Sequence, residues 1–232
     1  MTETSLAGPA PRGWPEWGVD VSDYNALSPA EYRWISANGA SFAIIRAYDG
    51  GTGEDERCDE HVREFSALGV EPGLYMFLRP AKVTPLHLQL EGFVTMIRRH
   101  AASMPRMLVA IDIEDGNNRK RWTAEDKPLL CLRYMAWRLQ KETGTRPFLY
   151  YNLSFGKQWK LHTDPSLMRY PLWAARWPKL PDRSDITLDQ VTKEFGRRPA
   201  IWQVGGTGRS VPKPIPRNLD KNVCPYVLER QR

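Results

Sequence analysis

The sequence has few cysteines and no long hydrophobic run among its 232 residues. Cys58, Cys131 and Cys224 are widely spaced and form no CxxC pair, so neither a disulfide framework nor a cysteine zinc site is indicated, and we expect free buried thiols. No apolar stretch approaches the roughly 18 residues that a membrane-spanning helix needs. Residues 1–17 lack the apolar centre of a secretory signal. We therefore expect no signal peptide and no membrane insertion.

The sequence also lacks any long block of basic residues. Its 33 lysines and arginines against 27 acidic residues give a net charge of +6, and the longest basic run is the triplet 119–121. This pattern does not predict a nucleic-acid-binding tail. The charge suits an anionic partner such as a nucleic acid, a membrane surface or a cell-wall polymer, or it serves solubility alone. With 41% hydrophobic residues the chain is too apolar to be disordered.

Short apolar runs alternate with segments of helical length. Helices are predicted over 29–38, 58–68, 85–101 and 124–143, and the first is marked by Ser28, Pro29 and Glu31 at its start. The predicted strands are 18–22, 42–47, 73–78, 107–113, 147–152, 171–176, 200–204 and 218–223.

This alternation predicts parallel βα units. Eight strands with about five helices indicate an α/β fold, an irregular TIM-like (β/α)5(β)3 barrel that forms a single domain over residues 17–232. Residues 1–16, rich in proline, glycine and alanine, are expected to be a flexible leader. The alternative is an open doubly wound sheet, which the absence of a GxGxxG or P-loop sequence disfavours.

Two acids in an apolar strand are the most informative feature of the sequence. Asp112 and Glu114 follow the run 108–111, and residues two apart in a strand point to the same face, about 6.6 Å apart. Burying a carboxylate costs several kcal/mol, so an apolar strand does not carry two without a reason. At the carboxyl end of a barrel strand that reason is usually catalysis.

Asp20 and Asp220 lie in the first and last predicted strands, which are neighbours in a closed barrel. We therefore expect four acids to meet at one mouth, where at least one keeps its proton near neutral pH. Asp23 and Asp115 are expected to pair with arginines or to cap loops. A metal site is the alternative for such a cluster.

No histidine lies beside Asp112 or Glu114, and no HExxH or EF-hand spacing occurs, so no metal and no cofactor is predicted. The four histidines are expected at the surface: His61, His87, His100 and His162.

Aromatic residues occur at several predicted strand ends, where some belong to the core and others are expected to stack on sugar faces. They are Tyr48, Tyr75, Phe77, Tyr150, Tyr151, Trp173, Trp177 and Trp202.

Several segments, in order, resemble glycoside hydrolase family 25, the muramidases found among bacterial and phage cell-wall lysins. The resemblance runs from Trp17 to about Val223, and AIDIED at 110–115 carries its Asp-x-Glu centre. The other matching segments are GVDVSDYN at 18–25, FAIIRAYDG at 42–50, GLYMFLRP at 73–80, PFLYYN, PLWAARW, IWQV and LDKN at 219–222.

The resemblance implies an irregular barrel and cleavage of the β-1,4 bond between N-acetylmuramic acid and N-acetylglucosamine. Glu114 would be the general acid/base and Asp112 would support the intermediate, with help from the N-acetyl group of the substrate. Asp20 and Asp220 would complete the acidic cluster. The substrate contacts would be Tyr75, Phe77, Tyr151, Trp173 and Trp202. The sequence departs from the family at Arg46, Tyr48, Asp49 and Met76.

The predicted function is therefore that of a lysin-like peptidoglycan hydrolase, a monomer whose partner is the peptidoglycan glycan strand. Such an enzyme would be made in a bacterial cytoplasm, from a bacterial or phage gene, and would act on the cell wall. Three alternatives stay open: a chitinase-like endo-N-acetylglucosaminidase, a barrel that binds wall glycan without cleaving it, and a metal-dependent phosphodiesterase.

Overall fold

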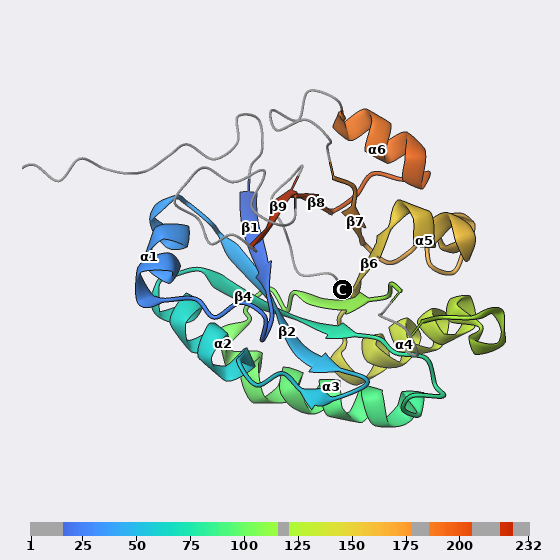
Figure 1. Ribbon diagram of the computed structural model, residues 1–232, viewed down its shortest axis with the longest axis horizontal. Coiled ribbons are helices and arrows are strands. Elements are labelled where there is room, and N and C mark those ends of the chain that lie inside the picture. The colour runs from blue at the N-terminus through green and yellow to red at the C-terminus, as the bar shows by residue number, and fades with distance from the viewer. Residues whose placement is uncertain (1–15, 116–120, 178–185, 206–218, 225–232) are drawn as a thin grey trace, which may run out of the picture.

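The computed structural model describes residues 16–115, 121–177, 186–205 and 219–224, and its strands form one sheet. Eight strands close into a barrel because β1 pairs with β2 on one side and with β9 on the other (Figure 1). The short β3 lies outside this ring and pairs antiparallel with the end of β2. The strands are β1 (Glu16–Val21), β2 (Phe42–Asp49), β3 (Gly53–Glu54), β4 (Glu71–Phe77), β5 (Val109–Asp112), β6 (Phe148–Asn152), β7 (Leu172–Ala175), β8 (Ile201–Gly205) and β9 (Asp220–Cys224).

The helices lie outside the ring of strands, with α1 to α4 along one side and α5 and α6 along another (Figure 1). They are α1 (Pro29–Ala37), α2 (Cys58–Ala67), α3 (Leu86–His100), α4 (Pro128–Thr143), α5 (Leu153–Gln158) and α6 (Leu188–Phe195). The helix α1 begins at the predicted position, and Ser28 and Glu31 form a capping box there, in which the side chain of each accepts a hydrogen bond from the backbone of the other.

The predicted barrel is confirmed, and each predicted strand and helix is present to within a few residues, with 124–126 forming a separate 3₁₀ turn before α4. Seven barrel strands run parallel to one another, whereas β9 is antiparallel to its two neighbours, β1 and β8. Consequently the first residue of β9, Asp220, lies opposite Asp20 near the end of β1. The reversal of β9 therefore brings both acids to one mouth.

Side chains alternate between two apolar layers. One layer lies between the strands and the helices and includes Val109 and Ile111, and the other fills the barrel and includes Leu108 and Ala110. The side chain of Asp112 continues the inward series of β5. The polar residues of the mouth thus lie above an apolar barrel interior.

The structure also tests the predictions for the cysteines, the histidines, the leader and membrane-spanning helices. The three cysteines are free and buried, as predicted. The surface prediction is wrong for His61 of α2, which is fully buried. Its Nδ1 lies 2.6 Å from the hydroxyl of Tyr32 in α1, and its Nε2 lies 3.3 Å from the carbonyl of Ser22, which follows β1. Most of the predicted leader lies outside the described residues, and Glu16 belongs to β1. No described helix is long and apolar enough to cross a membrane.

The closure of the barrel at β1 and β2 depends on a close approach at Gly18. A Cβ atom there would lie 2.3 Å from the carbonyl oxygen of Phe42 and 2.6 Å from its ring. We predict that Gly18→Ala lowers the free energy of unfolding by about 1–3 kcal/mol, because the two strands must separate. Urea unfolding measures the change, and a midpoint equal to that of the wild type would contradict it.

Candidate active site

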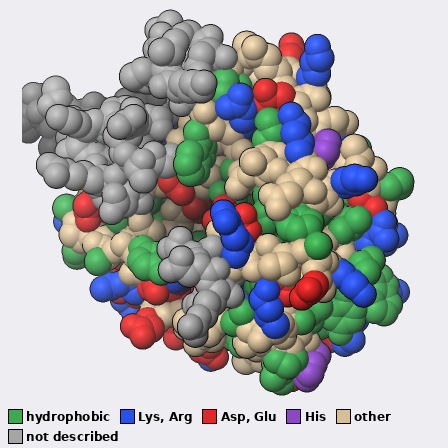
Figure 2. Space-filling view, turned by 45° about the vertical axis from the view of Figure 1, so that its right-hand side comes forward, with side chains coloured by type: hydrophobic (Ala, Val, Ile, Leu, Met, Phe, Trp, Pro, Cys, Tyr) green, Lys and Arg blue, Asp and Glu red, His purple; other side chains and the backbone are tan. Residues whose placement is uncertain are grey.

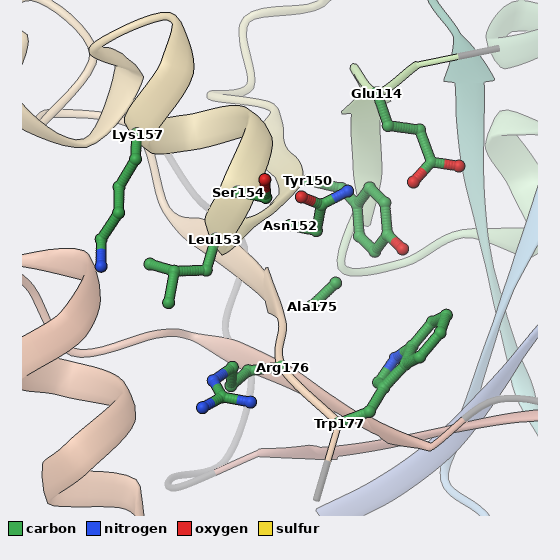
Figure 3. Close-up of a pocket in the computed structure, with 9 residues that line it drawn as sticks. All are labelled: Glu114, Tyr150, Asn152, Leu153, Ser154, Lys157, Ala175, Arg176 and Trp177. Carbon is green, nitrogen blue, oxygen red and sulfur yellow. The ribbon is translucent and has the colours of Figure 1, made fainter.

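The extended chain at the end of β5 carries Asp112 and Glu114 to the barrel mouth. Between them, the backbone N–H of Ile113 donates to the carbonyl of Tyr150 in β6 at 3.0 Å, which keeps this segment extended beyond the strand. Asp112 is buried and Glu114 is half-buried. Figure 3 shows the carboxylate of Glu114 on the same side of the mouth as the hydroxyl of Tyr150. Asp112 lies opposite Tyr150 in the strand register, and the charge of Glu114 acts on it, so the two acids share one face, as predicted.

Asp20 and Asp220 share the amide of one glutamine. Gln203 Nε2 donates to Asp20 Oδ2 at 3.0 Å and to Asp220 Oδ2 at 3.2 Å. A second amide, Asn222 Nδ2, donates to Asp20 Oδ2 at 2.7 Å. These contacts hold the carboxylate of Asp20 in place from β8 and β9. Figure 2 shows acidic side chains inside a hollow of the surface.

Three acids of the mouth, Asp20, Asp112 and Glu114, hold protons more tightly than ordinary carboxylates. Burial, together with the charge of Asp20, raises the pKa of Glu114 to about 7. Burial also raises the pKa of Asp20 to about 6, against the lowering effect of its two amide donors. Burial, followed by the charge of Glu114, raises the pKa of Asp112 well above its usual value. At neutral pH the cluster therefore retains protons beside negative charge, which is the predicted condition.

Two buried arginines near the cluster have acidic partners of their own. Arg79 donates from Nε and Nη2 to the two oxygens of Asp49, at 2.9 and 2.7 Å. Arg46 pairs with Asp55 at 2.8 Å and with Asp23. Both arginines lower the pKa of Asp112, yet burial outweighs them. Their charges are thus largely neutralised within the wall of the mouth.

Asp23 and Asp115, which lie outside the predicted acidic cluster, pair with arginines, as expected. Asp23 forms the ion pair with Arg46 described above, and Asp115 lies 3.5 Å from the guanidinium of Arg121. Among the departures from the family pattern, Met76 and Tyr48 point outward: Met76 is in the outer core, and Tyr48 packs over Gly92 of α3. These two differences therefore do not alter the mouth.

Three of the predicted sugar contacts are wrong, two because their side chains face away from the mouth and one because its ring is buried below it. Tyr151 and Trp202 lie in the core between the strands and the helices, with 0% and 3% of their surface exposed. The indole Nε1 of Trp202 donates to the carbonyl of Arg176 at 2.7 Å. Each is one residue away from an inward-facing neighbour, Tyr150 and Gln203, so alternation along the strand turns it away from the mouth.

Trp173 faces inward but is buried below the mouth. Its ring meets Tyr75 and Tyr150 edge-on, with centroid distances of 6.0 and 4.7 Å, and its Nε1 donates to Asn222 Oδ1 at 2.7 Å. With 2% of its surface exposed it supports other side chains and does not reach a substrate. Tyr75 and the half-buried Phe77 do face the mouth, where the Arg79 guanidinium lies 3.9 Å from the centre of the Phe77 ring.

Gln203 and Asn152 are functional candidates that were not identified from the sequence. The Oε1 atom of Gln203 accepts hydrogen bonds from Tyr150 at 3.0 Å and Trp177 at 2.9 Å, so this side chain joins the aromatic wall to the acids. Asn152 caps α5 through Oδ1 and makes a side-chain hydrogen bond with Glu114. A polar residue within the apolar run 200–204 was the available signal for Gln203.

A pocket of about 520 Å³ opens beside Glu114 (Figure 3). Its lining residues come mainly from β6, α5 and the end of β7. They are Glu114, Tyr150, Asn152, Leu153, Ser154, Lys157, Ala175, Arg176 and Trp177.

A closed α/β barrel with a protonated carboxylic acid beside other carboxylates, under aromatic side chains, is typical of a glycoside hydrolase. The model of the family Glycosyl hydrolases family 25 matches residues 19–209, so the chain belongs to this family and is a glycoside hydrolase. No curated protein sequence matches the chain significantly.

Solved structures share the fold. A family 25 glycosyl hydrolase from Bacillus anthracis has 20% identity and a TM-score of 0.69, over 95% of this chain and 93% of that one. The lysozyme of Streptomyces coelicolor has 20% identity and a TM-score of 0.67, over 89% and 90%. The spore cortex lytic enzyme SleM of Clostridium perfringens has 20% identity and a TM-score of 0.71, over 90% and 67%.

The raised pKa of Glu114 predicts a specific effect of pH on stability. Because the folded protein binds this proton more tightly than the unfolded chain, the free energy of unfolding falls as the pH rises from about 4.5 to about 7. We predict that Glu114→Gln removes this dependence and is more stable than the wild type at pH 8, on the order of 1–3 kcal/mol. Urea unfolding at pH 4 and pH 8 measures it.

The matched control is Asp115→Asn, the same change of acid to amide at an exposed neighbour. It is expected to unfold like the wild type at both pH values. If Glu114→Gln were equally stable or less stable at pH 8, Glu114 would not carry a raised pKa.

Proposed function

We propose that this enzyme hydrolyses the β-1,4 bond between N-acetylmuramic acid and N-acetylglucosamine in peptidoglycan. The family and the similarity to lysozymes and a spore cortex lytic enzyme support a peptidoglycan hydrolase. The observation that carries the proposal is the half-buried carboxyl of Glu114, whose pKa of about 7 keeps it partly protonated at neutral pH beside a pocket. All the acids come from one chain, so a monomer suffices, and its site of action is the cell wall.

In this proposal Glu114 is the general acid. Its proton passes to the glycosidic oxygen as the bond between that oxygen and the anomeric carbon breaks, and the departing sugar leaves with a hydroxyl group. Positive charge then develops on the remaining sugar, where the acetamido oxygen of the substrate bonds to the anomeric carbon. Asp112 and Asp20 stabilise this charge from within the mouth. Water then attacks the anomeric carbon and gives a proton to the Glu114 carboxylate, while the bond from that carbon to the acetamido oxygen breaks and the N-acetyl group is restored.

The aromatic side chains of the mouth suit a sugar chain. Tyr75, Phe77 and Tyr150 line the acidic centre, and Trp177 lies at the rim with 51% of its surface exposed. The indole of Trp177 is held by its hydrogen bond to Gln203 and leaves a face open to solvent. Such a fixed ring provides a surface on which a sugar can stack.

Replacing Glu114 by Gln tests the assignment directly. We predict that Glu114→Gln lowers the rate of muropeptide release from purified peptidoglycan by about 100–10,000-fold, because the amide cannot supply the proton. Asp115→Asn, which changes an acid next to the site but outside the cluster, is expected to retain the wild-type rate. Mass spectrometry of the wild-type products is expected to show N-acetylmuramic acid at the new reducing ends.

Other outcomes point to the alternatives. A reducing end on N-acetylglucosamine indicates an endo-N-acetylglucosaminidase, and binding without fragments indicates a non-catalytic barrel. Loss of activity with a chelator indicates a metal-dependent enzyme. A Glu114→Gln variant with near wild-type release rejects Glu114 as the acid.

The rate of hydrolysis should also fall as the pH rises above neutral. Because Glu114 acts in its protonated form, kcat/KM is expected to fall as the pH rises through about 7, approaching tenfold per pH unit above it. Initial rates from pH 5 to pH 9 at constant ionic strength measure this dependence. A rate that increases between pH 7 and pH 8 would mean that the essential group works as a base in the first step.

A further inference from the structure

The pocket beside Glu114 has one acidic end and one basic end. Figure 3 shows Lys157 and Arg176 on the side away from Glu114, with Leu153 and Ala175 between them and the acidic centre. The basic end is formed by α5 and by the residue that follows β7. A ligand group that reaches this end from the reacting bond passes along apolar side chains and meets positive charge.

The two cations at this end differ in their acidic partners. Arg176 forms an ion pair with Glu194 of α6, with Nε 2.8 Å from Oε2. That pairing, with a smaller effect of Lys157, lowers the pKa of Glu194, so Lys157 lies near this ion pair. Among the described residues no acidic side chain is within ion-pair distance of Lys157, which is exposed. Lys157 is therefore the cation at this end whose charge is open to a ligand.

We propose that this end of the pocket binds a carboxylate on the lactyl-peptide arm of a muramoyl unit, with Lys157 as its counter-ion. The inference rests on the proposed function and adds the substrate group that is recognised. The lactyl-peptide arm combines methyl groups with carboxylates, which matches apolar side chains leading to a cation. A chitin chain has no acid to place there, so Lys157 would favour muramoyl glycans over neutral ones.

Three substrates identify the group that Lys157 recognises. The first is glycan strands with their stem peptides, and the second is the same strands after an amidase has removed the peptides and left the lactyl carboxylate. The third is the peptide-free strands with that carboxylate converted to a neutral methylamide. The variant is Lys157→Met, and the matched control is Lys141→Met, which changes another exposed lysine, on α4.

We expect Lys157→Met to lower kcat/KM about fivefold on a carboxylate-bearing substrate at low salt, because an exposed ion pair contributes only a small binding free energy. The rate on the neutral methylamide should be unchanged. The difference should shrink at 0.5 M salt. A loss on the first substrate alone assigns the stem peptide, and a loss on the second assigns the lactyl group. Lys141→Met should equal the wild type on all three.

Two results would overturn the proposal: equal rates of Lys157→Met and wild type on every substrate, or the same loss on all three including the neutral one. Failure of the proposed function is a different result, because the wild-type enzyme itself would then release no muramic acid reducing ends from any strand.

Discussion

The site depends on a shortage of hydrogen-bond donors around carboxylates that are withdrawn from water. Asp20 receives two amide hydrogen bonds and Asp220 shares one of those amides, while no donor among the described residues reaches Oδ1 of the buried Asp112. The arginines of the wall are engaged by other acids. A cluster of this kind cannot be fully ionised at low cost, so protons stay on it near neutral pH. A carboxylic acid able to protonate a leaving oxygen is therefore a consequence of the packing.

The barrel creates this condition through the way it closes. If β9 were parallel to β1, Asp220 would lie at the opposite end of the barrel. Its antiparallel pairing instead sets Asp220 against Asp20, and Asn222 one inward step below. Gln203 from β8 then bridges the acids and the aromatic wall. Strands that are far apart in the sequence thus supply the anchoring amides.

The barrel and most of its acidic cluster were predictable from the sequence, because strands and helices alternate regularly and acids are conspicuous in apolar strands. The positions of Asp20, Asp112 and Glu114 follow from strand ends and alternation. The facing of aromatic residues was not predictable in the same way, since a strand buried on both faces shows no polar side that fixes the register. The sequence therefore predicts Tyr151 and Trp202 in the mouth, although their neighbours Tyr150 and Gln203 are the ones that face it.

The most direct test of whether the acidic cluster keeps a proton near neutral pH is the titration of the Glu114 side chain itself. Carbon NMR of protein labelled with ¹³C at the glutamate carboxyl groups, assigned by Glu114→Gln, reports its ionisation. We predict that the carboxyl group of Glu114 titrates with a midpoint near pH 7 in the wild type. The midpoint is expected to be lower in Asp20→Asn, because this variant lacks the neighbouring charge. A midpoint near 4.5 in the wild type, unmoved by Asp20→Asn, would contradict it.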